Sequence, residues 1–256
     1  MREETPEGKY VYCISGGEAR KHFGGIGVCG NHVYTISSQG MTAVVHDCQP
    51  TPYNSKDLAE AAKWLATHNK VIELAMNEFG ATVPLRFNTI FKPAESTTST
   101  QVLAQWMSEE NNVLKEKLRR VAGKKEYGVQ IYCGEEAFKG NAAALDDLKQ
   151  KISASSPGTA YLYRQKLDYA VTKNIQDTTV SLSRKFHSTI KENVSEISVL
   201  KKRNDVEGKL MLANFACLAD EAQAEKLGGE LEKIHENGFE VQFTGPWPPY
   251  NFMGTK

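Results

Sequence analysis

Apolar residues along the first half of the chain switch between the period of a strand and the period of a helix. Three segments rich in β-branched and aromatic residues predict strands: residues 9–15, 32–37 and 41–47. The polar stretch Ser38–Gly40 separates the last two and predicts a hairpin turn, because Gly40 can adopt a positive φ. From about Asp57 to Phe79 the apolar residues recur every three or four positions, which predicts an amphipathic helix.

The remainder of the first half adds a strand and a second helix. Residues 81–87, ATVPLRF, favour extended chain, and Pro84 suits a sheet edge or a strand end. Apolar residues between Leu103 and Val121 share one helical face, and Gly123 can end that helix. We assign these elements to a mixed α+β domain over residues 1–123.

The second half begins at the polar joint GKKEYG and again alternates strands with helices. The predicted segments are a strand at 127–133, helices at 141–158 and 159–190, strands at 196–202 and 209–219, a helix through Leu227 and Ile234, and a strand at 239–243. Apart from one extra helix near its start, this is the βαββαβ order of the ferredoxin-like fold. The sequence therefore predicts an α+β protein of two domains, with a ferredoxin-like domain over residues 124–256 that includes the C-terminal tail.

Charge and composition narrow the classes of function. Basic and acidic side chains balance to a formal net charge of zero, so no overall positive field exists to hold nucleic acid. The polar N-terminus lacks a secretory signal core, and no run reaches the roughly 18 apolar residues of a membrane span. Five cysteines, an odd number, do not suggest a disulfide framework and favour a reducing, cytoplasmic compartment.

A glycine-rich segment, GGIGVCG, has the spacing of a dinucleotide-binding loop between Gly25 and Gly30. That use requires a strand before the loop and a helix N-terminus after it. The following residues, HVYTIS, predict a strand instead. The segment therefore favours a glycine loop without a phosphate ligand.

Two cysteines and two histidines form the one candidate metal site. Cys29-x-x-His32 precedes the predicted hairpin, and His46-x-Cys48 ends it, so all four side chains are expected at the open end of the hairpin. Two thiolates and two imidazoles suit tetrahedral zinc. The short spacing of the second pair is unusual for a structural site, and a buried thiol beside an unrelated histidine is the alternative.

His68 and Arg86 are the remaining side chains with possible chemistry. His68 lies on the apolar stripe of its helix and is expected to be a core histidine bonded to a carbonyl, with a catalytic base as the alternative. Arg86 interrupts an apolar run and predicts a solvated side chain or a cation that faces a partner. The sequence contains no nucleophile elbow, Walker loop or H-E-x-x-H motif, so we expect neither an enzyme nor a bound cofactor.

The chain ends on an aromatic, proline-rich segment that is unusual for a free tail. Its distinctive residues are Gly245, Pro246, Trp247, Pro248, Pro249, Tyr250 and Phe252. The glycine permits a turn and the prolines lack donors, so we expect the tail to leave the last strand and fold back. Either Trp247 and Tyr250 pin the tail onto the second domain or the domain joint, or the aromatic residues form a surface that contacts a partner.

The tail block FTGPWPPYNF closely resembles the C-terminal signature of gas vesicle accessory proteins of the F/L family (GvpF/GvpL-like). Further blocks similar to that family's follow in the same order along nearly the whole chain: YVYCI (10–14), GMTAVVHD (40–47), WLATHNKVIE (64–73), VPLRFNTIF (83–91), KEYGVQIY (125–132) and MLANFACL (211–218). Asn88 replaces a usual glycine, and asparagine also tolerates a left-handed turn. His46 replaces a usual small residue, so a zinc site would be peculiar to this chain.

The resemblance implies a non-enzymatic role in gas vesicle assembly. It implies a minor component of gas vesicles that binds the small hydrophobic shell protein and limits its aggregation during nucleation. The resemblance thus implies a cytoplasmic protein that associates with the vesicle, with the shell protein and other accessory proteins as partners. It also implies two α+β domains, the second ferredoxin-like.

Two other classes of function remain as alternatives. One is a ferredoxin-like protein that binds or converts a small molecule at the His68 and Arg86 region. The other is a binding module stabilised by zinc.

Overall fold

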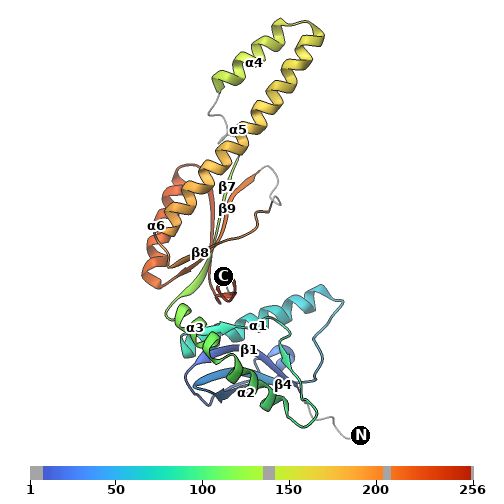
Figure 1. The fold of residues 1–256 in the computed structure, drawn as a ribbon, viewed down its shortest axis with the longest axis vertical. Coiled ribbons are helices and arrows are strands. Elements are labelled where there is room, and N and C mark those ends of the chain that lie inside the picture. The colour runs from blue at the N-terminus through green and yellow to red at the C-terminus, as the bar shows by residue number, and fades with distance from the viewer. Residues whose placement is uncertain (1–7, 135–141, 204–208, 255–256) are drawn as a thin grey trace. The chain divides into compact units, whose positions relative to one another are not determined.

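The computed structural model describes residues 8–134, 142–203 and 209–254 (Figure 1). The chain divides into two compact units. Unit 1 comprises residues 1–126 together with residues 246–256, and unit 2 comprises residues 127–245. Both units combine a sheet with helices, so the predicted α+β class is confirmed. Among the described residues, no helix combines the length and the apolarity that crossing a bilayer requires.

Unit 1 is built around a six-stranded sheet with the order β2-β3-β4-β1-β5, in which β6 also pairs with β1. The strands are β1 (Gly8–Gly16), β2 (His22–Gly24), β3 (Val33–Ser38), β4 (Met41–Cys48), β5 (Thr82–Pro84) and β6 (Ile90–Phe91). The helices are α1 (Leu58–Phe79), α2 (Ser99–Glu109) and α3 (Asn111–Val121), and short 3-10 turns lie at η1 (Val28–Gly30) and η3 (Tyr250–Phe252). The predicted hairpin is present, because β3 and β4 pair antiparallel around residues 39–40.

Side chains of the central strand β1 pack into two separate apolar clusters. Tyr10 and Tyr12 pack with α1 residues such as Ile72, whereas Val11 and Ile14 pack with residues of α2 and α3. The register of β1 against β4 shifts between Val11 and Cys13, which marks a β-bulge. A bulge inserts one residue and so interrupts strict alternation between the two faces of a sheet. The sheet is therefore covered by α1 on one face and by α2 and α3 on the other.

One predicted helix is two helices in the structure. The apolar face expected to run unbroken from Leu103 to Val121 is divided at Glu110, whose ψ of 8° ends α2 and begins α3. Both helices still direct leucines into the same cluster. Asn111 and Asn112 follow the break, and asparagine is a weak helix former, which accounts for an interruption inside a continuous apolar pattern.

The glycine-rich loop is followed by a strand, as the sequence predicts. Its last residues form the 3-10 turn η1, and β3 begins at Val33. Cys29 adopts a positive φ of 58° within that turn. The helix that a dinucleotide-binding loop requires after the glycines is thus replaced by β3.

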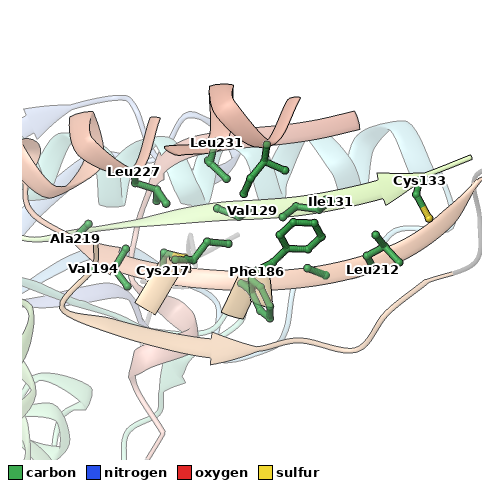
Figure 2. Close-up of a cluster of buried hydrophobic side chains, with 14 residues drawn as sticks. Val129, Ile131, Cys133, Phe186, Val194, Leu212, Cys217, Ala219, Leu227 and Leu231 are labelled. Carbon is green, nitrogen blue, oxygen red and sulfur yellow. The ribbon is translucent and has the colours of Figure 1, made fainter. Parts of the chain in front are cut away.

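Unit 2 carries a four-stranded sheet with the order β10-β7-β9-β8. Its strands are β7 (Lys125–Cys133), β8 (Glu196–Val199), β9 (Leu210–Ala219) and β10 (Glu240–Trp247), and its helices are α4 (Ala142–Ala154), α5 (Pro157–Lys191) and α6 (Glu221–Glu236). Figure 2 shows the apolar core, in which β7 and β9 meet Phe186 of α5 and Leu227 and Leu231 of α6. The nearly continuous apolar run of β9 is buried, as expected for an inner strand.

The element order of unit 2 follows the predicted order, with α4 as the extra helix. The boundary between the two units lies after Glu126, three residues beyond the predicted boundary at residue 123. The assignment of the tail to the C-terminal domain was wrong, because residues 246–256 group with unit 1.

The last strand also extends further than predicted. β10 continues through Gly245 and Pro246 to Trp247, so the expected end of the strand near Gly245 was wrong. β10 is an edge strand of its sheet. Proline is tolerated on an edge strand because the donor that it lacks can face away from the neighbouring strand.

The Gly27→Ala substitution is expected to destabilise unit 1. An added Cβ at this position would lie 2.7 Å from the Asn31 carbonyl oxygen and 2.8 Å from the Tyr12 hydroxyl. Overpacking of this kind costs about 1–3 kcal/mol of unfolding free energy. Gly16→Ala is the matched control, since a Cβ at Gly16 meets no atom within 4 Å. Urea denaturation compares the two variants, and equal unfolding free energies would contradict the packing of this loop.

Candidate functional site

The C-terminal tail docks on unit 1 through polar contacts and one buried aromatic side chain. Phe252 is 2% exposed. Its carbonyl oxygen accepts a hydrogen bond of 2.9 Å from Arg120 Nη1, and the Tyr250 hydroxyl donates to Asn69 Oδ1 at 2.9 Å. Tyr250 also packs against the α1-side cluster, and the Arg120 guanidinium lies 5.9 Å from the centre of the Phe252 ring. The tail is thus held by α1 and α3 of unit 1.

A buried carboxylate fixes the residue between these two aromatics. Glu126 Oε2 accepts from the Asn251 backbone N–H at 2.9 Å, and Glu126 Oε1 accepts from Asn251 Nδ2 at 2.6 Å. Glu126 is only 6% exposed. Burial raises the pKa of the Glu126 carboxyl, and the two bonds from Asn251 oppose that rise. Both oxygens of the carboxylate are therefore satisfied by the tail, and removal of the tail would leave this polar group without these partners.

The tail residues singled out in the sequence take up different environments. Gly245 and Pro246 lie in β10, while Pro248 and Pro249 are buried after it. Trp247 is 46% exposed. Trp247 and Tyr250 were expected to pin the tail onto the second domain or the domain joint. Tyr250 instead bonds Asn69 of unit 1, and Phe252 is the buried aromatic residue of the tail.

A chain of hydrogen bonds lies inside unit 1 around His46. The Val28 N–H donates to the Tyr12 hydroxyl at 2.9 Å, and that hydroxyl lies 2.8 Å from His46 Nδ1. His46 Nε2 lies 2.9 Å from the Tyr53 hydroxyl. The Tyr53 hydroxyl also accepts from Asn31 Nδ2 at 3.0 Å, so each tyrosine oxygen has a backbone or amide donor in addition to the imidazole, and a neutral His46 donates to one hydroxyl and accepts from the other.

His68 repeats the same arrangement beside it. The Asn88 N–H donates to the Tyr10 hydroxyl at 3.3 Å, and that hydroxyl lies 2.8 Å from His68 Nδ1. His68 Nε2 lies 3.1 Å from the carbonyl oxygen of Leu85, which can only accept. The Nε2 atom of His68 therefore carries a proton. The prediction of a core histidine bonded to a carbonyl is confirmed.

Asn88 connects this network to the loop before α1. It adopts a left-handed φ of 67°, which confirms that asparagine supports the turn at this position. Its side chain also pairs with the Tyr53 backbone, since Oδ1 accepts from the Tyr53 N–H at 2.9 Å and Nδ2 donates to the Tyr53 oxygen at 2.9 Å. Glycine has no side chain with which to make these bonds.

Burial keeps both histidines uncharged at neutral pH. Each imidazole is fully buried, and desolvation lowers the pKa of His46 and of His68 from 6.5 to about 4. Burial likewise raises the pKa of Tyr53 to about 12. These groups are satisfied donors and acceptors in an apolar environment, an arrangement that rigidifies a core.

The candidate zinc site was wrong. Cys29 and His32 are exposed, whereas His46 and Cys48 are buried. Both ring nitrogens of His46 are engaged by tyrosine hydroxyls. Across the residues that the structure describes, no three His, Cys, Asp or Glu side chains come close enough to hold a metal ion.

His68 and Arg86 do not form a shared open site. His68 is fully buried, and both of its ring nitrogens have partners. Arg86 is exposed. The geometry therefore gives no support to the alternative of a small-molecule site at these two residues.

A groove of about 830 Å³ lies beside the glycine loop. The loop and the first turns of α1 line it, with Asp57, Glu60 and Lys63 as its charged residues and Trp64 as its aromatic one. Two carboxylates against one ammonium group do not favour a phosphate ligand. The groove thus agrees with the interpretation of GGIGVCG as a loop without a nucleotide.

Sequence reasoning missed three residues that organise the site. Glu126 and Asn69 hold the tail, and Tyr53 joins His46 to Asn88. Their partners lie between 7 and 181 positions away in the sequence. The available signals were the blocks KEYGVQIY and WLATHNKVIE, which contain Glu126 and Asn69 but do not indicate a contact with the tail.

Comparisons with known proteins agree on one family. A family model described as "Gas vesicle synthesis protein GvpL/GvpF" matches residues 8–254. The chain is 29% identical to gas vesicle protein L1 of Halobacterium salinarum, over 96% of this chain and 90% of that protein. It is 30% identical to gas vesicle protein L of Haloferax mediterranei, over 88% of this chain and 72% of that protein.

A solved structure shows the same fold. The crystal structure of the gas vesicle protein GvpF from Anabaena sp. PCC7120 superposes with a TM-score of 0.75 at 22% identity, over 98% of this chain and 99% of that one. The match extends over nearly the full length of both chains, so the mixed α+β architecture described above is shared as a whole.

Phe252→Ala is expected to cost about 3–5 kcal/mol of unfolding free energy, because it empties a buried aromatic site. Trp247→Ala is the matched aromatic control in the same tail. Its side chain is 46% exposed, so its loss is expected to cost about 1 kcal/mol or less. Urea denaturation measures both values. A Trp247→Ala cost equal to that of Phe252→Ala would contradict the assignment of Phe252 as the anchor.

The unfolding free energy is expected to fall as the pH is lowered from 6.5 to about 4. Above this range neither folded nor unfolded histidines are protonated, so stability is unaffected by them. Within it the unfolded chain binds protons that folded His46 and His68 do not, which removes up to about 3 kcal/mol per histidine. Glu126, whose pKa is raised, acts in the opposite direction at the acidic end.

Urea denaturation at several pH values measures this slope. NMR titration of the two imidazoles gives an independent check, with midpoints expected near pH 4. Midpoints close to 6.5 for His46 and His68 would show that these side chains are solvated. They would then not account for a fall in unfolding free energy at acidic pH.

Proposed function

Since the chain belongs to the gas vesicle synthesis protein GvpL/GvpF family, we propose that it is a minor, non-enzymatic component that takes part in gas vesicle assembly. The observation that carries this proposal is the family match over nearly all described residues. The buried histidines are consistent with it, because their nitrogens serve the packing of unit 1 and are closed to a substrate.

The partner in this proposal is the small hydrophobic shell protein of the vesicle. A subunit that faces gas must be apolar on one side, and such a chain aggregates before assembly unless its apolar face or strand edge is covered. Unit 2 offers edge strands β8 and β10 for strand addition. Val199 on β8 is 64% exposed and Phe243 on β10 is 40% exposed, so both edges present apolar side chains. Other gas vesicle accessory proteins are further partners.

Two exposed residues of unit 1 are proposed as contact positions. Arg86 is exposed between two half-buried residues, and Trp247 is 46% exposed beside the buried Pro248. An exposed tryptophan on a segment fixed by Phe252 is held in place without being hidden. This combination suits a contact residue, since little conformational freedom is lost when a partner binds.

The second unit is proposed to be ferredoxin-like. Numbered within the unit and without its helices, its strand order β10-β7-β9-β8 is 4-1-3-2. The pattern of connections and the antiparallel pairing of β8 with β9 support this assignment. We further propose that the protein works in the cytoplasm in association with the vesicle and requires no cofactor.

Co-purification with the shell protein tests the proposal. The chain at micromolar concentration is expected to associate with the shell protein and to reduce the light scattering that the shell protein develops alone. Trp247→Ala is expected to weaken the association with little change in unfolding free energy. Leu58→Ala is the matched control, because it shortens another apolar residue of unit 1 that is 85% exposed. Absence of association at micromolar concentration would remove the assembly proposal.

A further inference from the structure

Helix α5 is far longer than the sheet that it covers. It has 35 residues, Pro157–Lys191, and therefore spans about 52 Å at 1.5 Å per residue. Only its C-terminal portion, with Leu182, Phe186 and Ile190, packs into the core of unit 2. Figure 1 shows that its N-terminal portion extends past the sheet beside α4. This portion is one arm of a two-helix hairpin.

The N-terminal portion of α5 has an apolar stripe toward α4. Ala160 is 5% exposed, and Tyr163, Leu167 and Ala170 are half-buried. These residues recur at spacings of three and four, as expected for a face that packs on a neighbouring helix. The stripe accounts for the pairing of α5 with α4.

A second set of apolar residues lies on another face of the same helix. Leu162 is 57% exposed, Tyr169 is 70% exposed and Val180 is 42% exposed. At about 100° per residue these three side chains project within roughly 20° of one direction, about 120° around the helix from the stripe toward α4. We call this face the outer stripe. A helix with two apolar stripes at such an angle suits contact with two neighbouring helices.

The outer stripe also carries a single sign of charge. Lys166, Lys173 and Arg184 project within roughly 40° of the direction of Leu162. All three are exposed, and in the described parts of the chain none of them forms an ion pair. Lys166 Nζ lies 5.7 Å from the centre of the Tyr163 ring. The nearest carboxylate on α5 is Asp177, about 60° to the side.

The combination of apolar residues and cations points to one kind of partner. We infer that the outer stripe binds an acidic amphipathic helix of another protein. The apolar face of that helix covers Leu162, Tyr169 and Val180, and its carboxylates pair with the three flanking cations. Together with the bound helix, α4 and the N-terminal portion of α5 would form a three-helix bundle. The inference is independent of the proposed contact with the shell protein.

Charge argues against a second copy of the same stripe as the occupant. Two outer stripes packed face to face would place lysines and an arginine from both chains at one interface. Like charges across an interface oppose association. With an acidic partner, carboxylates face the lysines and the arginine of the outer stripe, and the charges across the interface attract each other.

Binding of designed helical peptides to the full chain tests the inference. Three fluorescein-labelled peptides of equal length are compared by anisotropy: an amphipathic helix with leucine and glutamate, the same helix with lysine for glutamate, and a scrambled acidic sequence. The leucine–glutamate helix is expected to bind at least about tenfold more tightly than either of the others. Equal affinity for the acidic helix and its scrambled form would overturn the inference.

Variants locate the contact. Leu162→Ser with Tyr169→Ser, and separately Lys166→Glu with Lys173→Glu, are each expected to weaken binding at least about tenfold. Val171→Ser with Arg164→Glu is the matched control. It makes the same types of change on exposed residues at roughly 180° to the outer stripe and should leave affinity unchanged. Circular dichroism confirms that every variant retains its helices.

Two other outcomes would replace the inference. Binding to vesicles of phosphatidylserine but to none of the peptides would show that a membrane surface occupies the stripe, since basic amphipathic helices also suit anionic lipid. Sedimentation of the free chain as a dimer that Leu162→Ser with Tyr169→Ser dissociates would show that a second copy occupies it.

Discussion

The pairing of Asn251 with the Glu126 carboxylate is the contact on which the chain's organisation depends. Glu126 is the last residue of the first part of unit 1, and Asn251 lies in the tail that returns to that unit. The whole of unit 2 is therefore an insertion between these two partners. A buried carboxylate has a large desolvation cost, and here two hydrogen bonds from one residue offset part of it. Loss of the tail would leave that cost without this compensation.

The insertion has a consequence for cooperativity. The chain leaves unit 1 at β7 and returns at the end of β10, and these two strands are neighbours in the sheet of unit 2. Docking of Phe252 thus fixes both covalent links of unit 2 to the same unit. Release of the tail would free one of these two links while the other stays connected.

The paired tyrosine–histidine chains give unit 1 a defined core. An apolar core of the same size tolerates alternative packings, whereas Tyr10–His68 and Tyr12–His46 add directional hydrogen bonds that join β1 to α1 and to β4. At His68 the Leu85 carbonyl oxygen requires a proton on Nε2, so in the neutral imidazole Nδ1 is left to accept from the Tyr10 hydroxyl. Burial in the core of unit 1 therefore lowers the pKa of both histidines and also requires that their ring nitrogens find hydrogen-bond partners within the protein.

Local sequence patterns were sufficient for most of the elements. The amphipathic period of α1, the turn before Met41 and the alternation in β7 depend on neighbours within a few residues, so they could be predicted. The hairpin itself was also right, since β3 and β4 pair antiparallel with Tyr34 opposite Val45. The zinc site expected at the open end of the hairpin was wrong. The two ring nitrogens of His46 contact tyrosine hydroxyls from β1 and from the loop before α1 instead.

The contacts that hold the tail could not be predicted from periodic patterns, because they join residues far apart in the sequence. Asn251 bonds a residue 125 positions away, and Tyr250 bonds one 181 positions away. A proline-rich aromatic tail indicates that something must cover it but does not indicate which surface does. The β-bulge in β1 was missed for a similar reason, since one inserted residue changes the faces of the strand without changing its composition.

The use of polar groups inside unit 1 limits where recognition can occur. His46, His68 and Glu126 are buried and satisfied, so a partner that engaged them would first have to break the core or release the tail. That opening would cost free energy that binding must recover. The surfaces that need no opening are the exposed cations and apolar residues on α5, the sheet edges of unit 2, and Trp247 on the docked tail. This division suits the assembly role proposed above, since a rigid core would stay intact while the exposed faces bind and release partners.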